Sequence, residues 1–156
     1  MSTIHLAKAL KLKNRLAGRL AKVQLDIQTY NSVLQEQHGK VDVLALLEIR
    51  EQIVEALVGL KTNIVLANAE IQHDLIRLGE AKSELTFVEN LPVRDGLERH
   101  DFQNTEVMWA ATLKKSDIDA RRKKLEAFVD LTQDKIDAFN HNKELGIPQS
   151  WLDLAS

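Results

Sequence analysis

The 156-residue sequence contains no cysteine, which excludes disulfides, thiolate metal ligands and a thiol nucleophile. It has only six glycines and two prolines, and aromatic residues make up 4% of the chain. This scarcity of turn-forming and aromatic residues argues against both a β-rich and a disordered protein. No stretch approaches the ~20 apolar residues that span a bilayer, and the N-terminus lacks an apolar signal core. The absence of cysteine is compatible with a reducing compartment, and we expect a cytoplasmic protein. The net charge of −2 gives no general attraction to polyanions.

Apolar residues in the first half of the chain recur at the spacing of paired helices. One set lies within residues 3–37 and advances in alternating steps of four and three: Leu16, Leu20, Val23, Ile27, Tyr30, Leu34. A second set lies within residues 42–72: Ile49, Ile53, Leu57, Leu60, Ile64, Ala67, Ile71. Gly39 permits a turn between them, and Asp42 is suited to cap the second helix. The short turn predicts an antiparallel, coiled-coil-like hairpin whose buried residues include Leu20, Val23, Ile27, Ile53, Leu57, Leu60 and Ile64.

The second half of the chain predicts further helices around a connection. Residues 72–74 either separate the second helix from a third over residues 75–90, or lie within one bent helix that reaches Asn90. Residues 91–104 contain Pro92 and the turn pair Asp95-Gly96, and are expected to be an exposed connection. A last helix is expected over residues 117–143, followed by a tail over residues 146–156. Residues 1–156 are therefore predicted to form a single all-α domain, an antiparallel bundle of three to four long helices.

The run TEVMWAATL, which begins at Thr105, has no polar face at helical period. We predict that residues 106–112 are extended and that Trp109 is substantially buried. The partner of such a strand is either the 91–104 connection or another copy of the chain, because no other strand candidate exists.

Four stretches of the sequence resemble the septicolysin-type family of small helical bacterial proteins, most of which have no established function. They are LAKALKLKNRL (Leu6 to Leu16), Lys61-Thr62-Asn63, Thr105-Glu106-Val107, and the closing set Ile136, Asn140, Glu144 and Leu145. The chain departs from the family at Gln72-His73-Asp74, which replaces an Asp-Gly turn, and at His141, which replaces a Trp, so it resembles a distant member. The resemblance implies an all-helical fold with one short extended segment. The cytolysin name of some members implies membrane activity.

Residue patterns of catalytic and metal sites are nearly absent. Glu70 and His73 form a Glu-x-x-His half-site of the kind found in di-iron bundles, but the second half-site that such a centre needs is missing. No two glycines lie close enough together for a phosphate-binding loop, and no histidine pair has the spacing of a zinc protease. We expect no enzyme activity, no metal, no cofactor and no small-molecule substrate.

Charge and tryptophan supply the candidate interaction residues. The first helix carries six basic residues and no acidic one before residue 23: Lys8, Lys11, Lys13, Arg15, Arg19 and Lys22. Such a helix binds a membrane surface or nucleic acid, or is a solvated face matched to acidic helices of the same bundle. A second basic cluster comprises Arg121, Arg122, Lys123 and Lys124. Trp109 and Trp151 are each either a core anchor or a contact with a partner.

These features predict a non-enzymatic helical interaction module that forms a homo-oligomer, a dimer or a larger assembly. The alternatives are a membrane-active or membrane-surface protein and a nucleic-acid-binding coiled-coil arm. Wide apolar stripes favour the oligomer, because Val54, Val58, Val65, Phe128 and Leu131 exceed what one hairpin needs. The last helix is basic in its first half and acidic in its second. An antiparallel partner copy could therefore set residues 121–124 against Asp134 and Asp137.

Overall fold

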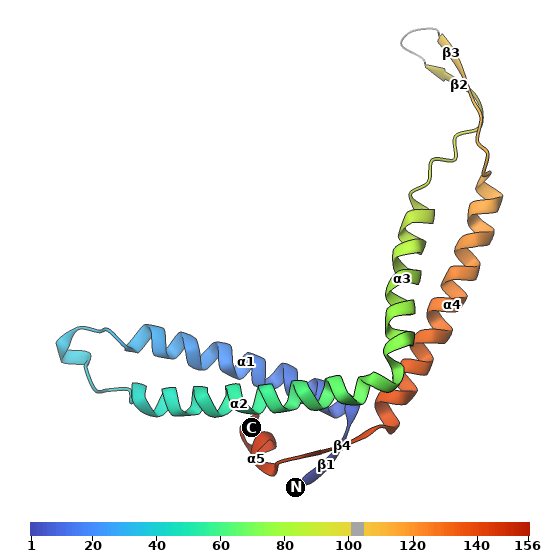
Figure 1. The fold of residues 1–156 in the computed structure, drawn as a ribbon. Coiled ribbons are helices and arrows are strands. Elements are labelled where there is room, and N and C mark those ends of the chain that lie inside the picture. The colour runs from blue at the N-terminus through green and yellow to red at the C-terminus, as the bar shows by residue number, and fades with distance from the viewer. Residues whose placement is uncertain (101–104) are drawn as a thin grey trace. The chain divides into compact units, whose positions relative to one another are not determined.

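The computed structural model describes residues 1–100 and 105–156, and the protein is mostly helical (Figure 1). The helices are α1 (Leu6–Tyr30), η1 (Gln35–Gln37), α2 (Val43–Asn68), η2 (Ala69–Ile71), α3 (Gln72–Glu89), α4 (Lys115–Asn142) and α5 (Gln149–Asp153). The strands are β1 (Ser2–His5), β2 (Gly96–His100), β3 (Thr105–Trp109) and β4 (Glu144–Ile147). The prediction of a mostly helical chain is confirmed, but two small antiparallel sheets occur where one extended segment was expected. The packing of three to four long helices in one bundle stays a prediction. Two compact units can be distinguished, residues 1–70 with 137–156 and residues 71–136.

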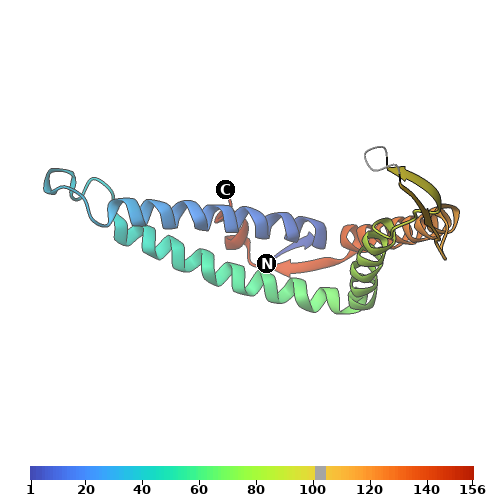
Figure 2. The same ribbon diagram turned by 90° about the horizontal axis from the view of Figure 1, so that it is seen from above.

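In the first unit α1 and α2 lie side by side and antiparallel (Figures 1 and 2). The predicted hairpin core is largely confirmed, because Val23, Ile53, Leu57, Leu60 and Ile64 are buried. Leu20 and Ile27 are only partly buried and pack against this cluster. The 3-4 spacing brings these apolar side chains onto one face of each helix, so their burial fixes which faces meet.

A two-stranded sheet joins the two ends of the sequence within this unit. β1 pairs antiparallel with β4, with Ser2 opposite Ile147 and His5 opposite Glu144. Ile4 and Ile147 are buried in the same core as the helices, at 5% and 0% exposure. The prediction that residue 3 begins a helix is therefore wrong. The residues predicted as a tail, 146–156, contain the end of β4 and the helix α5. The sequence does not predict these strands, because each is only four residues long.

The turn between α1 and α2 differs in length from its prediction. α1 ends at Tyr30 instead of residue 37, and Leu34 lies beyond it with 66% of its surface exposed. Leu34 continues the heptad spacing but belongs to the connection between α1 and α2, because α2 begins at Val43. The predicted turn residues are confirmed. Gly39 has a positive φ of 79°, and the Asp42 carboxylate accepts a hydrogen bond from the Ala45 amide at 3.0 Å.

The second unit contains α3, α4 and the β2–β3 hairpin. The 3-10 turn η2 lies between α2 and α3, so the chain is helical without a loop from Val43 to Glu89. The interruption falls at residues 69–71, three residues before the predicted break at 72–74. Asp74 of α3 forms an ion pair with Lys135 of α4 at 2.7 Å, and Arg77 lies 5.1 Å from the centroid of the Phe128 ring. The buried residues of these helices are few: Leu78, Ala81, Val88, Ile118, Thr132 and Ile136.

Of residues 106–112, which were predicted to be extended, 106–109 are confirmed as part of β3, which pairs antiparallel with β2 in the 91–104 connection. Gly96 faces Trp109 across the ladder, and Arg99 forms an ion pair with Glu106 at 3.1 Å. The strand ends at Trp109, so the prediction of extended structure over residues 110–112 is wrong. The 91–104 connection is not entirely a loop, because it contains β2. Residues 101–104 of that connection lie outside the described residues. Because β3 has an intrachain partner, it gives no support to self-association.

Candidate interaction surfaces

Trp109 is exposed, so the prediction of a buried side chain is wrong. It retains 39% of its surface and lies beneath the Arg94 guanidinium, 5.1 Å from the ring centroid. Leu97 and Met108 of the same hairpin are 53% and 72% exposed. A two-stranded sheet buries an aromatic side chain only if another layer covers it, and the cation–π contact with Arg94 covers only part of this ring.

Asp95 fixes the base of the hairpin. Its carboxylate accepts hydrogen bonds from the Lys114 ammonium and, at 3.1 Å, from the Ala111 main-chain amide. These interactions stabilise the charged carboxylate. The Lys114 hydrogen bond and then the Ala111 amide lower the pKa of Asp95 below its ordinary 3.8, against a small opposing effect of desolvation. The residue before β2 is thereby tied to the residues that follow β3.

Protonation of Asp95 is expected to loosen this hairpin in acid. Because its pKa is lower in the folded chain than in the unfolded one, its stabilising contribution is complete above about pH 4 and is lost as the pH falls further. In a Trp151→Phe background, Trp109 fluorescence should change as the pH falls below this value. Asp95→Asn should show the acid spectrum already at neutral pH. An identical titration in both proteins would contradict this assignment.

The four basic residues of the α4 cluster, residues 121–124, differ in their exposure and ion pairing. Arg121, Lys123 and Lys124 are exposed, whereas Arg122 lies within 3.9 Å of Asp119 and 3.7 Å of Glu126 in its own helix. The predicted pairing of residues 121–124 with Asp134 and Asp137 of another copy stays a prediction. Exposed ion pairs contribute only ~0–1 kcal/mol each, so the cluster could orient a partner but would contribute little affinity.

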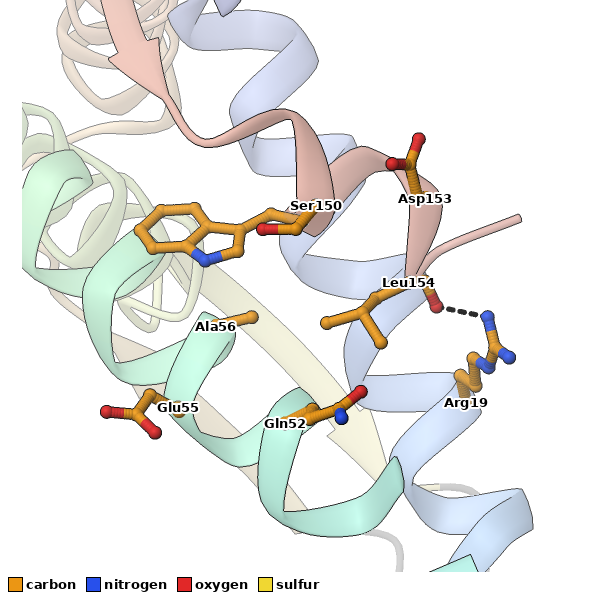
Figure 3. Close-up of a pocket in the computed structure, with 8 residues that line it drawn as sticks. Arg19, Gln52, Glu55, Ala56, Ser150, Asp153 and Leu154 are labelled. Atoms are coloured by element: carbon orange, nitrogen blue, oxygen red, sulfur yellow. Dashed lines mark hydrogen bonds between the residues drawn. The ribbon is translucent and has the colours of Figure 1, made fainter. Parts of the chain in front are cut away.

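Trp151 is partly buried and lies against the first unit's own helices. A Cβ atom placed on Gly59 of α2 would lie 2.6 Å from the Trp151 Cζ2 atom, so the indole occupies the space that a side chain at residue 59 would need. Arg19 of α1 donates to the main-chain oxygens of Leu154 and, at 3.0 Å, of Ser156. Residues of α1, α2 and the segment from Ser150 to Leu154 line an open cleft of about 460 Å³. Figure 3 shows Arg19 facing the Leu154 carbonyl at this cleft.

The other basic residues of α1 make no contact comparable to that of Arg19 among the described residues. Lys8, Lys11 and Arg15 are exposed, as is Lys22, and they follow helical spacing along one face with Arg19. Arg19 alone among these is bound to the chain's C-terminal segment. The basic face predicted from sequence is therefore present as a helix face, and its role stays a prediction.

Exposed apolar side chains with helical spacing lie on α2 in the first unit. We call the helix face that carries them the α2 outer stripe: Leu44, Leu47, Glu51, Val54, Val58, Lys61 and Val65. Its steps alternate between three and four residues, so its members fall on one side of the helix. Leu44, Val58 and Val65 are 74%, 61% and 68% exposed. Val54 and Val58 also line a shallow depression of about 310 Å³ with Arg50, Glu51 and Glu55.

Sequence reasoning identified Val54, Val58 and Val65 only as apolar residues beside the main stripe. Their 3-4 spacing with Leu44 and Leu47 was the available signal that α2 has two apolar faces. The first face packs against α1 through Ile53, Leu57, Leu60 and Ile64, and the outer stripe lies on the other side of the helix. A helix in a simple two-helix hairpin needs only the first face.

Within residues 1–100 and 105–156, no group of three or more His, Asp or Glu side chains is arranged to hold a metal ion. Glu70 of the half-site instead contacts Lys143. No helix in the described ranges combines the length and apolar character needed to cross a membrane. Comparisons of the chain with family models, curated proteins and solved structures found no match. The resemblance to the septicolysin-type family therefore stays an expectation from the sequence.

Proposed function

We propose that the protein is a non-enzymatic helical interaction module that functions by self-association. The observation that supports this most strongly is the α2 outer stripe. Burial of one Val or Leu side chain contributes roughly 1.5–3 kcal/mol, so several such side chains on a straight helix face favour association with another helix. The stripe has the heptad spacing of a coiled-coil face, with only Glu51 and Lys61 interrupting its apolar residues.

The exposed side chains favour α2 over α4 as the associating helix. Within the described part of the chain, α4 has one exposed large apolar side chain, Leu131, with 71% of its surface exposed. On α2 there are Leu44, Leu47, Val58, Val65 and Leu66, at 36% to 74%. Apolar burial supplies most of the affinity of an interface, while charges at its rim chiefly set orientation and rate. The α4 charge pattern is therefore the weaker basis for a stable assembly.

Val58→Glu is expected to abolish the assembly, because each copy would place an unpaired carboxylate in the middle of the apolar interface. Light scattering during gel filtration should give a mass above 17.7 kDa for the original chain and 17.7 kDa for the variant at micromolar concentration. Leu131→Glu is the matched control, since it adds the same charge at an exposed apolar position of α4. It should leave the assembly intact.

Two outcomes would contradict the proposal. A mass of 17.7 kDa for the original chain would rule out self-association at that concentration. An assembly that survives Val58→Glu but is lost with Leu131→Glu, or on charge reversal at residues 121–124, would move the interface to α4.

A further inference from the structure

Six of the seven residues of the α2 outer stripe are arranged symmetrically about Ala56, and the seventh, Leu44, is as far from Ala56 as Asn68. Residues equidistant from Ala56 on the two sides are Val54 and Val58, Glu51 and Lys61, and Leu47 and Val65. Two of these pairs are apolar, and the third joins opposite charges. Glu51 and Lys61 have no ion-pair partner among the residues that the structure describes, and both are exposed.

We propose that the occupant of the α2 outer stripe is the same stripe of a second copy, running antiparallel about a two-fold axis at the level of Ala56. This rests on the proposed self-association and specifies its geometry. A two-fold interface brings residue i against residue j of the partner, and j against i. A stripe symmetric about Ala56 then sets Val54 against Val58, Leu47 against Val65, and Glu51 against Lys61, each pair occurring twice.

Other arrangements of two stripes are chemically poorer. A parallel, in-register pair sets Glu51 against Glu51 and Lys61 against Lys61, and like charges facing each other oppose association. An antiparallel pair shifted by one heptad sets Lys61 against Leu44 or against Val58, which leaves the ammonium without an acidic partner across the interface. Of these arrangements, only the symmetric antiparallel register pairs Glu51 with Lys61 and also places apolar side chains opposite one another at the four inner apolar positions, while Leu44 lies opposite Asn68.

The rest of the first unit leaves this face of α2 open. The buried side chains of α2 that pack in the core lie on the α1 side, and Trp151 packs at Gly59. Val58 and Val65, by contrast, expose more than half of their surface. Two copies could therefore approach through the stripe without displacing α1 or α5.

A charge exchange tests the proposed register. Glu51→Lys alone and Lys61→Glu alone should each raise the dimer dissociation constant about tenfold, because two attractive pairs become two repulsive ones. The double variant Glu51→Lys/Lys61→Glu restores opposite charges and should return the constant to near that of the original chain. Sedimentation equilibrium measures all four proteins, and circular dichroism verifies that each remains helical.

Cysteine cross-linking distinguishes the orientation, because the natural chain has no cysteine. Leu47→Cys mixed with Val65→Cys should give a disulfide-linked heterodimer under mild oxidation. Neither protein alone should cross-link, because the two equivalent positions in an antiparallel pair are roughly 27 Å apart along the helix. A parallel pair would instead cross-link each protein with itself.

The results of these experiments distinguish failure of the antiparallel pairing from failure of self-association. A monomeric original chain would overturn both. A dimer in which Leu47→Cys links to itself, or in which the double charge exchange fails to restore affinity, would keep self-association and overturn the antiparallel pairing.

Discussion

Leu60→Ala is expected to lower the free energy of unfolding of the first unit by roughly 2–5 kcal/mol. Leu60 has no exposed surface and lies in the core between α1 and α2. Truncation removes its buried methyl groups and leaves a cavity, and two paired helices have few further layers that could collapse into it. The related Leu57→Ala, at 6% exposure, should fall in the same range.

Leu25→Ala is the matched control for this measurement. Leu25 belongs to α1 of the same unit, but 61% of its surface is exposed, so truncation should change stability by less than about 0.5 kcal/mol. Urea denaturation followed by far-ultraviolet circular dichroism gives both values. Equal effects of the two substitutions would mean that the α1–α2 face does not supply the stability of this unit.

The hairpin could be predicted from sequence because its signal is long and regular. Ile53, Leu57, Leu60 and Ile64 repeat at helical spacing over more than three turns, and only one face can collect them. The ends of the helices carried a weaker signal. Leu34 obeys the spacing but is exposed, because burial depends on an opposite helix that does not reach it.

The small sheets could be predicted only in part. The run from Thr105 to Trp109 was recognisable, since a β-branched residue, Met and Trp occur together without a helical polar face. Its partner GLERH has no alternation of apolar and polar residues, so only the pairing itself identifies it as a strand. The large apolar side chain of Trp109 favours burial. Burial also requires a second layer over the hairpin, and the sequence pattern does not predict whether such a layer is present.

The candidate interaction residues, too, could be predicted only in part from the sequence. The basic clusters and both tryptophans were visible as residue types, whereas their partners depend on tertiary contacts. Arg19 differs from its basic neighbours only because the C-terminal segment passes beside it. The α2 outer stripe was readable in principle, since its 3-4 spacing is present in the sequence. The sequence alone does not show that this second stripe is exposed, because the longer stripe of the same helix already explains the hairpin.

Gly59 is the clearest case of a residue whose role required the structure, and it leads to the second prediction. In a helix interior, replacing glycine with alanine normally stabilises by about 1 kcal/mol. Gly18→Ala of α1 should show this gain, because no atom lies within 4 Å of the added Cβ. Gly59→Ala should instead destabilise by roughly 1–3 kcal/mol, since carbon atoms pack at about 3.5–4.0 Å and the new Cβ lies 2.6 Å from Trp151 Cζ2.

The cause can be isolated with a second substitution. In a Trp151→Ala background the collision is absent, so Gly59→Ala should recover the gain of about 1 kcal/mol seen at Gly18. In a Trp109→Phe background, the fluorescence of Trp151 reports α5 directly, and Gly59→Ala should shift it to the red as the indole moves into water. Gains of equal size at Gly18 and Gly59, with an unshifted spectrum, would mean that Trp151 does not occupy this site. The sign of one methyl group's effect thus decides whether the C-terminal helix is docked on α2.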